Sequence, residues 1–377
     1  MGGSAFRDCA RRILALIPLA LCAVTSAADA QGRTRNVVLV TLDGVRTEEI
    51  FGGLDVGVLR STVGEARDPA DTETYRKYWA ATPEERRALL MPFFWGQLMQ
   101  TQGSIGGNQE LGSRVLLTNE RRFSYPGYSE LLTGQAHDDV IVSNDPVRNP
   151  YPTVLEFLKR KLELSSREVA AFASWSVFRW IVEHEEGAMT VNAGFESYDH
   201  PDPQVRMLSQ LQFDTATPWD TVRHDAYTFR FALAHLRTYR PRVVYLALGD
   251  ADDWAHGGRY DRYLDSVARA DGYLQQLWEF LQGDEQYRGT TSLVIAVDHG
   301  RGKTPADWTA HGADVEGAQN VWVAVASPDV PLRGEWRGGA VVYQNQIAAS
   351  VARLLGFDLG EQNPTAGRPI DRLFEGP

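Results

Sequence analysis

Residues 36–43 read Asn-Val-Val-Leu-Val-Thr-Leu-Asp, an unbroken apolar run that ends on a carboxylate. Such continuous apolarity is typical of a strand whose two faces are both covered by helices. Similar runs recur along the chain and alternate with segments of helical periodicity, which indicates βαβ units. The expected strands are 36–42, 114–117, 169–173, 242–248, 292–297 and 321–326. The sequence therefore predicts an α/β fold with a largely parallel central sheet flanked by helices on both faces.

Helical patterns fill the gaps between these runs, and the clearest covers 259–282. The expected helices are 83–101, 152–164, 221–239, 259–282 and 343–355. Two stretches, about 53–90 and 178–220, do not fit the alternation. We expect them to be insertions that cap a site at the carboxyl ends of the strands, where α/β folds bind ligands. Surface decoration without a role is the alternative.

Residues 1–30 are typical of a secretory signal, with a basic start, an apolar middle at 13–24 and the small-residue cleavage site Ala28-Asp29-Ala30. The apolar stretch is too short to span a bilayer. A retained amphipathic anchor and a lipoprotein attached at Cys22 are the alternatives. We expect a mature domain of 31–377 without a membrane span, in the periplasm or secreted.

The composition of the chain excludes several classes of function. The chain has 377 residues, 43% of them hydrophobic, so it can bury a large core. Its net charge of −11 repels a phosphate backbone, which argues against nucleic acid as a bulk partner. Both cysteines, Cys9 and Cys22, lie in the expected signal. The mature chain would then have no thiol for disulfides, thiolate metal sites or cysteine nucleophiles.

Three of the expected strands end in acidic or imidazole side chains. Asp43 follows the first, Asp250 and Asp252 follow another, and Asp298 with His299 follows a third. Because parallel strands place their carboxyl ends at one edge of the sheet, these groups should lie together. The pattern predicts a shared metal site there.

The ligand types indicate which metal binds. Asp and His without thiolates suit Zn²⁺, with Mn²⁺ or Fe next. Asp252 and His256 are four residues apart, so on a helical turn both could face one ion. His311 follows a short polar loop that can return to the same edge.

These motifs, in this order, resemble those of the alkaline phosphatase superfamily, nearest to its nucleotide pyrophosphatase and type I phosphodiesterase branch. The matches extend from residue 36 to about 328, most of the mature chain. They are Asp43, Ser124, Asp252 with His256, Asp298-His299 and His311-Gly312.

The resemblance implies an alkaline phosphatase-like fold and two zinc ions. One ion would be held by Asp43, Asp298, His299 and the Ser124 oxygen, and the other by Asp252, His256 and His311. Ser124 would be the nucleophile that attacks a small phosphate-ester substrate and forms a covalent intermediate.

Ser124 lies in Ser124-Tyr125-Pro126, and Pro126 suits the first turn of a helix. Free N–H groups of that turn would point toward a bound phosphoryl group. A plain helix cap is the alternative for Ser124, with Ser129 and Thr118 as other nucleophile candidates. Asn144 resembles an Asn that contacts a phosphoryl oxygen in some family members, or is a turn residue.

Some positions depart from the family pattern. The Arg of the sulfatase motif Cys/Ser-x-Pro-x-Arg is missing, and Gly127 stands where related diesterases often place Asn. Phosphomonoesterases of this family often place a Lys or Arg over the terminal phosphate oxygens, and Arg179 is the only nearby candidate for that role. Asp250 and Asp253 could replace Asp252 or orient a histidine. Asp271, on a mostly apolar helix, is expected to be a structural hydrogen-bond partner.

The sequence thus favours an exported zinc-dependent hydrolase of phosphate esters, either a phosphodiesterase or a phosphatase. A sulfatase-like enzyme and a phospho-group transferase share much of this machinery. A catalytically inactive relative that binds a ligand is the alternative from another class. No oligomeric state is predicted.

Overall fold

A computed structural model describes residues 1–2, 32–64 and 67–375, and the fold lies within the unit Gly32–Pro377. The expected signal at 1–30 therefore falls, but for its first two residues, outside the described part. The strands are β1 (Asn36–Leu42), β2 (Gly103–Gly106), β3 (Val115–Leu116), β4 (Val169–Ala173), β5 (Thr190–Ala193), β6 (Val243–Leu248), β7 (Thr291–Ala296), β8 (Asn320–Val321), β9 (Val323–Ala326), β10 (Gly334–Glu335) and β11 (Val342–Tyr343).

Helices make up most of the remaining regular structure. The α-helices are α1 (Thr47–Gly52), α2 (Val56–Val63), α3 (Glu73–Tyr78), α4 (Pro83–Leu90), α5 (Met99–Thr101), α6 (Ser124–Thr133), α7 (Val154–Lys161), α8 (Phe178–Ile181), α9 (Pro203–Asp214), α10 (Asp225–Tyr239), α11 (Asp250–His256), α12 (Tyr260–Gly283), α13 (Gln346–Leu354) and α14 (Asp371–Phe374). The 3₁₀ turns are η1 (Pro69–Asp71), η3 (Gln109–Leu111) and η4 (Leu359–Glu361), and η2 (Phe94–Leu98) is a π-helix.

The main sheet has eight strands in the order β10-β2-β9-β7-β1-β6-β4-β5. β1 lies at its centre, and Val37 pairs in parallel with both Val243 of β6 and Ser292 of β7. Within this sheet only β9 runs against the others, because it is antiparallel to β7 and β2. The predicted α/β fold with a largely parallel sheet is confirmed, and every residue of β1, β4, β6 and β7 is buried.

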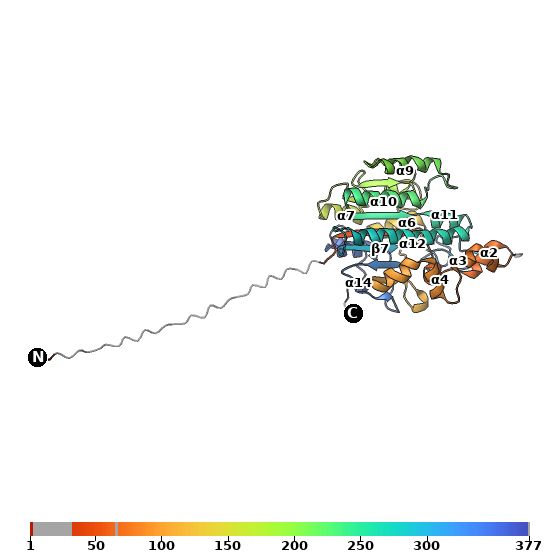
Figure 1. Cartoon of the computed structure of the whole chain (residues 1–377), viewed down its shortest axis with the longest axis horizontal. Coiled ribbons are helices and arrows are strands. Elements are labelled where there is room, and N and C mark those ends of the chain that lie inside the picture. Colours follow the sequence, from red (N-terminus) through yellow and green to blue (C-terminus); the bar gives the residue numbers. More distant parts are fainter. Residues whose placement is uncertain (3–31, 65–66, 376–377) are drawn as a thin grey trace. The chain divides into compact units, whose positions relative to one another are not determined.

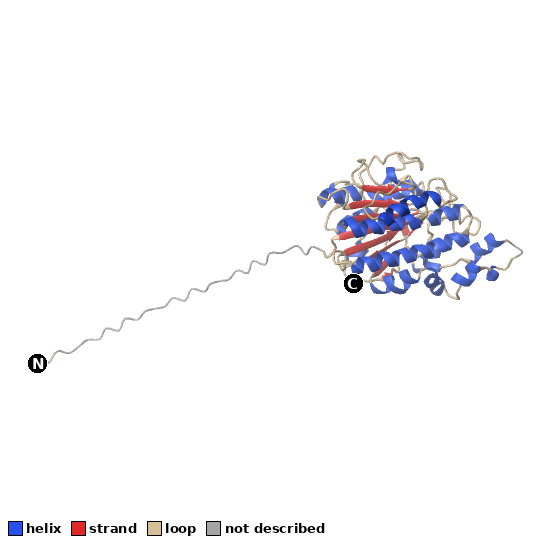
Figure 2. Cartoon of the chain, turned by 45° about the horizontal axis from the view of Figure 1, so that its top comes forward, coloured by secondary structure: helices blue, strands red, loops and turns tan. Residues whose placement is uncertain are grey.

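Helices cover both faces of this sheet. α10 packs on β4 and β6, and it lies with α12 in front of the strands in Figure 1. On the other face α13 packs on α6 and α7, and α7 also packs on β6. Figure 2 shows the strands of the sheet side by side, with helices lying across them. This double cover explains why the strands consist almost entirely of apolar residues.

The expected strand 321–326 is divided in two. Asn320 and Val321 pair with β3 in a second sheet, whose order is β11-β3-β8, whereas Val323–Ala326 joins the main sheet. Trp322 lies between the two parts, and its indole N–H donates to the Val45 carbonyl oxygen at 2.9 Å. The expected strand 114–117 also belongs to the second sheet, as the two-residue β3.

The expected helix 83–101 is wrong as one element, because α4 ends at Leu90. Met91 has φ −132° and ψ 71°, and Pro92 follows it. A proline disfavours helical backbone in the residue before it, which accounts for the break. The chain then resumes as a π-helix, where Asp271 accepts from the N–H groups of Phe93 and Phe94 at 2.9 and 2.8 Å. Asp271 thus has the structural hydrogen-bonding role expected for it.

The two stretches expected as insertions differ from each other. The segment 53–90 is helical, and its α2, α3 and α4 lie together at one side of Figure 1. The segment 178–220 also contains β5, the edge strand of the main sheet. The second stretch is therefore partly an integral piece of the fold. Its edge strand was missed because Thr-Val-Asn-Ala lacks an apolar run.

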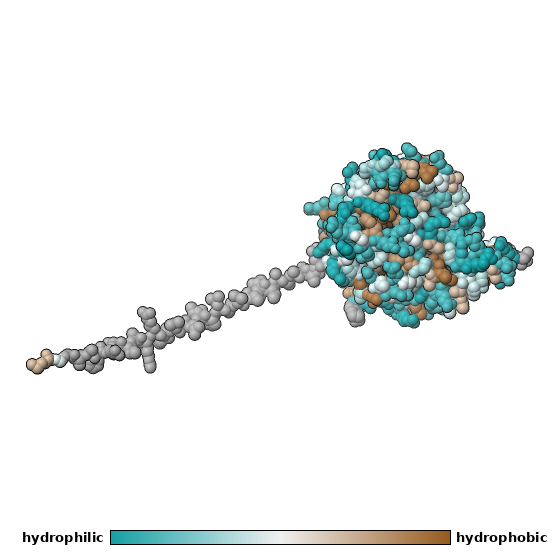
Figure 3. Space-filling view, in the orientation of Figure 1, coloured by the Kyte–Doolittle hydropathy of each residue, from teal (hydrophilic) through white to brown (hydrophobic). Residues whose placement is uncertain are grey.

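The surface in Figure 3 is mostly hydrophilic, with scattered hydrophobic side chains. In the described residues, no helix combines the length and the apolarity that crossing a bilayer requires.

Candidate active site

The acidic and imidazole side chains singled out in the sequence meet at the carboxyl ends of the central strands. Asp43 directly follows β1, and Asp298-His299 follows β7 after one residue. Asp252 and His256 belong to α11, which begins one residue beyond the end of β6. Since β1 is paired with both β6 and β7, the three chain segments emerge side by side.

Asp43, Asp298 and His299 form what we call the strand-end group. His299 Nε2 lies 3.6 Å from Asp43 Oδ1 and 3.4 Å from Asp298 Oδ2. His299 Nδ1 lies 2.9 Å from the Gly300 carbonyl oxygen, a distance that suits donation by an Nδ1–H, and its Nε2 faces the two carboxylates. The three possible ligand atoms lie within 4.8 Å of one another.

The strand-end group fits a cation. Tyr128 Oη donates to Asp43 Oδ2 at 2.8 Å, and the Gly44 N–H donates to Asp298 Oδ1 at 3.1 Å. The remaining oxygens, Asp43 Oδ1 and Asp298 Oδ2, are buried and find no hydrogen-bond partner in the described structure. Burial, and then the charge of Asp298, raises the pKa of Asp43, and burial also raises the pKa of Asp298. A metal ion among these atoms would supply the missing positive partner.

Asp252, His256 and His311 form a second set, which we call the helix–loop group. His256 Nε2 lies 3.1 Å from Asp252 Oδ2 and 3.1 Å from His311 Nε2. Asp252 and His256 are one helical turn apart on α11, as the sequence predicts. The ligand atoms of Asp252 and His311 lie within 4.8 Å of one another and of a His299 ring nitrogen, so His299 lies between the two groups.

The pKa values of both histidines of the helix–loop group lie below the usual range, which favours the neutral imidazole. Burial lowers the pKa of His256. Burial, followed by the nearby His299, lowers the pKa of His311. A neutral imidazole has the free lone pair that a metal ligand needs. This group therefore also has the chemistry to hold a cation.

Ser124 is the first residue of α6 and is nearly buried, with 6% of its surface exposed. Its Oγ lies 3.4 Å from His299 Nε2. One helical turn later, Tyr128 contacts Asp43 through its hydroxyl, so one face of α6 presents both side chains to the strand-end group. Burial raises the pKa of Tyr128 well above its usual value, so it remains a hydrogen-bond donor.

A glycine allows α6 to approach the strand end this closely. A Cβ on Gly127 would lie 2.4 Å from the Asp298 carbonyl oxygen. Gln344 Nε2 donates to that oxygen at 3.0 Å and to the Gly127 carbonyl oxygen at 2.9 Å, which holds the helix to the strand. The departure from the family's Asn at this position thus has a steric reason.

Asn144 lies against the start of α6. Its Oδ1 accepts from the Tyr125 N–H at 2.9 Å, which fixes the orientation of the amide. No described residue accepts from its Nδ2, and Asn144 lines the cavity beside Ser124. The expectation of several free N–H groups here is wrong in part, because the Tyr125 N–H is used and Pro126 has none.

α11 is held in place by two buried carboxylates. Asp225 Oδ1 accepts from the Gly249 N–H at 2.7 Å, and its Oδ2 accepts from the Asp250 N–H at 3.2 Å. In return, Asp250 Oδ1 accepts from the Asp225 N–H at 3.0 Å. Each residue thus caps the helix that begins with the other. Asp250 is therefore an anchor of α11 and does not take the place of Asp252.

A cavity of about 180 Å³ opens between Ser124 and the helix–loop group. It is lined by Asp43, Ser124, Asn144, Trp175, Thr221, Val222, Gly249, Asp252, Asp253, His256 and His311. Burial raises the pKa of Asp253 to about 7. Among these described lining residues there is neither Lys nor Arg. Arg179 is also absent from the lining, because its Nε donates to Glu196 Oε1 at 2.8 Å and the two side chains form an ion pair.

The other nucleophile candidates lie away from this cavity. Ser129 and Thr118 are not among its lining residues, and Ser129 is fully buried within α6. Neither of the two expected insertions contributes a lining residue, although Trp175, Thr221 and Val222 flank the segment 178–220. At this cavity the two expected insertions therefore form no part of the wall, while residues next to the second of them do.

Sequence reasoning missed two residues of the site, Tyr128 and Arg301. Tyr128 follows Ser124 by four residues, one turn of the expected helix, so its position was a usable signal. Arg301 follows Asp298-His299 by two residues, and its side chain is fully buried against Asp252. Its position in the sequence, close after the two expected ligands, was the signal that could have identified it as a site residue.

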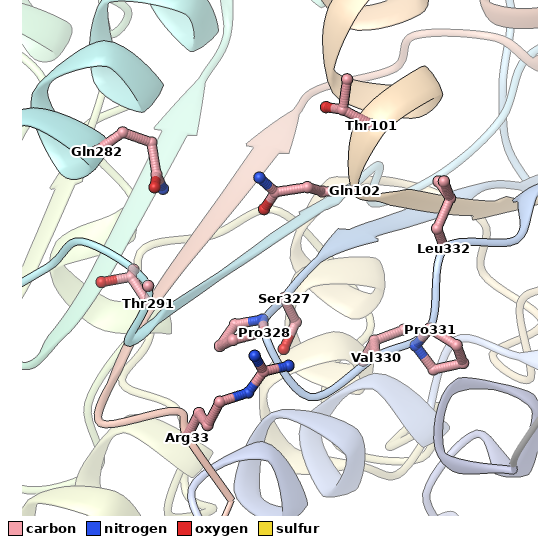
Figure 4. A pocket seen from close by; sticks show the side chains of 11 residues that line it. Arg33, Thr101, Gln102, Gln282, Thr291, Ser327, Pro328, Val330, Pro331 and Leu332 are labelled. Atoms are coloured by element: carbon pink, nitrogen blue, oxygen red, sulfur yellow. The ribbon is translucent and has the colours of Figure 1, made fainter.

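A different hollow, of about 450 Å³, lies at the opposite end of β7 (Figure 4). Thr291, at the start of that strand, lines it together with Ser327 and Leu332, and Arg33 is its only charged lining residue in the described chain. It shares no residue with the candidate site.

No protein-family model and no curated protein matches this sequence. Solved structures do match its fold. An alkaline phosphatase, PafA, matches with a TM-score of 0.56 at 10% identity, over 92% of this chain and 99% of that one. A protein of the alkaline phosphatase superfamily from Vibrio parahaemolyticus matches with a TM-score of 0.52 at 12% identity, over 90% and 71% of the two chains.

The chain has the alkaline phosphatase-like fold. A phosphonate monoester hydrolase from Silicibacter pomeroyi has a similar structure, with a TM-score of 0.53 at 12% identity, over 91% of this chain and 78% of that one. The fold predicted from the motifs is therefore confirmed. At 10–12% identity these likenesses show the shared fold, and the function has to be argued from the site itself.

Proposed function

We propose that this chain is an exported, metal-dependent hydrolase of phosphate esters that acts through Ser124, in the manner of type I phosphodiesterases. One observation carries the proposal. Ser124 Oγ lies 3.4 Å from His299 Nε2, at the point where carboxylates and imidazoles at the carboxyl ends of the strands converge. A serine in such a setting is suited to nucleophilic attack.

The residues present fit two divalent ions, for which zinc is the proposed identity. Asp43, Asp298, His299 and Ser124 would hold one, and Asp252, His256 and His311 the other; these donors suit zinc, with manganese or iron as alternatives. Such ions, when bound, favour the ionised serine oxygen and offset the charge on phosphoryl oxygens. The unpartnered oxygens of Asp43 and Asp298 are the structural support for this assignment.

The protein's own residues would position the reaction. Ser124 releases its hydroxyl proton to solvent, its Oγ forms a bond to phosphorus while the bond from phosphorus to the leaving oxygen breaks, and the leaving alkoxide takes a proton from water. Water then cleaves the serine–phosphorus ester and regenerates the hydroxyl. Asn144 Nδ2 would donate to a phosphoryl oxygen, and the contact of its Oδ1 with the Tyr125 N–H and its place in the cavity lining support this role.

The cavity favours a phosphodiester over a phosphomonoester. Its lining has the carboxylates of Asp43, Asp252 and Asp253, and no Lys or Arg among the described residues. A monoester dianion would meet more repulsion here than a diester monoanion. Trp175 and Val222 offer an apolar wall to the leaving group.

The test is hydrolysis of matched nitrophenyl phosphate mono- and diesters by the purified protein, with bound metal counted by mass spectrometry. We expect two zinc ions per chain and a kcat/KM at least about tenfold higher for the diester. Ser124→Ala should lower kcat by at least about 1,000-fold. Ser129→Ala, on the same helix but outside the cavity, should retain activity.

Other outcomes would select another function. Full turnover by Ser124→Ala would rule out the covalent route. Hydrolysis of a sulfate ester alone would favour a sulfatase, and phosphoryl transfer to an added alcohol without net hydrolysis would favour a transferase. Absence of metal and of activity would favour an inactive ligand-binding protein.

Export is proposed on the composition of residues 1–30. N-terminal sequencing of the protein from cell fractions tests it. We expect a chain that starts at Gln31 in the periplasm or medium; an intact Met1 in the cytoplasm would contradict export.

A further inference from the structure

The side chain of Arg301 is enclosed within the candidate site. It comes from the loop after β7, two residues beyond His299, and its side chain is fully buried. A buried guanidinium without acceptors is unfavourable, so its contacts indicate what it is for. It lines no part of the cavity, and it therefore does not face a substrate.

Two chain segments of the helix–loop group accept from this guanidinium. One of its terminal nitrogens donates to Asp252 Oδ1 and, at 3.2 Å, to the Asp252 carbonyl oxygen. The other donates to the Thr309 carbonyl oxygen, two residues before His311. Arg301 thus connects α11, which carries Asp252 and His256, with the loop that carries His311.

These contacts divide the Asp252 carboxylate between two tasks. Oδ1 is taken by Arg301, while Oδ2 lies 3.1 Å from His256 Nε2. Oδ2 is consequently the oxygen that remains for an ion shared with His256 and His311. A carboxylate held in this way binds through one oxygen in a fixed direction.

The surrounding backbone leaves little freedom for the pair. A Cβ on Gly44 would lie 2.5 Å from Asp252 Oδ1 and 2.8 Å from Arg301 Nε. Gly44 has φ +60°, a conformation that favours glycine, so this close approach is part of how the chain turns after β1. A planar guanidinium can serve both acceptors at once, whereas a lysine ammonium at the end of its flexible stem serves them less well.

We propose that Arg301 is the positioning residue of the helix–loop group, which fixes the Asp252 carboxylate and the His311 loop so that one metal ion can bind there. This inference rests on the metal site of the proposed function. It assigns no chemical step to Arg301. It predicts instead that removing the guanidinium weakens one of the two ions and leaves the strand-end ion in place.

The test counts metal rather than turnover. Wild type, Arg301→Met, Arg301→Lys and Arg240→Met are dialysed against buffered zinc and analysed by mass spectrometry, and cobalt-loaded samples are compared by absorption. Arg240 is the matched control, since it forms a two-pronged ion pair with Asp284 far from the site. We expect wild type and Arg240→Met to hold two ions. In Arg301→Met the affinity for one ion should fall about 10- to 100-fold, with a smaller fall in Arg301→Lys.

The outcomes separate this inference from the proposed function. Two ions bound with unchanged affinity in Arg301→Met would overturn the role of Arg301 and leave the metal site standing. No ion in the wild type would overturn the metal site, and this inference with it. If Arg301→Met fails to fold, as a melting curve in chelator would show, Arg301→Lys decides, and wild-type affinity in that variant would count against the proposal.

Discussion

The strand-end group and the helix–loop group are built on different supports. Asp298 and His299 have no exposed surface, and they follow a strand that pairs directly with β1. His256, by contrast, has 49% of its side chain exposed, on a helix of seven residues. The sheet itself sets the position of the first group, whereas the second depends on side-chain contacts from Arg301, Asp225 and Asp250. We therefore expect the first to resist perturbation and the second to respond to it.

The largest effect should come from the strand-end group. Asp298→Asn changes a buried carboxylate whose Oδ2 has no hydrogen-bond partner in the described structure, and it should weaken binding of the ion proposed beside the nucleophile. We expect kcat/KM to fall by more than about 100-fold. This is a larger loss than is usual when a residue that only hydrogen-bonds to a metal ligand is changed. Steady-state kinetics with metal analysis checks this. Asp314→Asn, an exposed change near His311, is the control and should match wild type.

The helix–loop group should lose metal without losing stability. His256→Ala removes a half-exposed side chain, so the free energy of unfolding should change by less than about 0.5 kcal/mol. Affinity for one zinc ion should fall at least about tenfold, as measured by zinc titration alongside urea unfolding. A large loss of stability would show that the helix–loop group contributes to the stability of the fold as much as the strand-end group does.

A pair of glycine substitutions compares the packing of the two halves directly. Gly127→Ala places a methyl group 2.4 Å from the Asp298 carbonyl oxygen, so we expect destabilisation by about 1–3 kcal/mol. Gly257→Ala, at the end of α11, meets its nearest atom at 3.5 Å and should stay within about 0.5 kcal/mol of wild type. Equal losses in urea unfolding would contradict the difference between the halves.

The smallest effect should follow metal removal. With chelator, amide hydrogen exchange should rise a few-fold in α11 and in residues 303–311, because these segments lose a shared ligand. Exchange in β1 and β7 should not change, since those amides open only with the whole sheet. Mass spectrometry of peptides before and after zinc is restored measures both. Faster exchange in β1 would mean that the metal also stabilises the sheet.

The sequence predicted β1, β6 and β7 within a residue or so, because buried parallel strands carry a strong apolar signal and an acidic residue follows each within two residues. It missed β2 and β5, since Gly-Ser-Ile-Gly and Thr-Val-Asn-Ala become strands only through pairing with neighbours. It also missed Arg301, because a buried arginine is recognised by its acceptors, and these come from Asp252 and Thr309. Local sequence patterns show which residues can act as ligands or nucleophiles. The residues that orient them make contacts between distant parts of the chain, which local patterns do not reveal.

The central position of β1 has a consequence for how the protein is made. Its partners β6 and β7 lie about 200 and 250 residues later in the chain. At the usual pace of about 5–20 residues per second, the ribosome releases β1 some 10 to 40 s before β6 exists. During that interval a strand of Val and Leu has nothing to pair with, which is a hazard for aggregation. Nascent chains of this protein should therefore depend on a chaperone that shields their first forty-odd residues until synthesis is nearly complete.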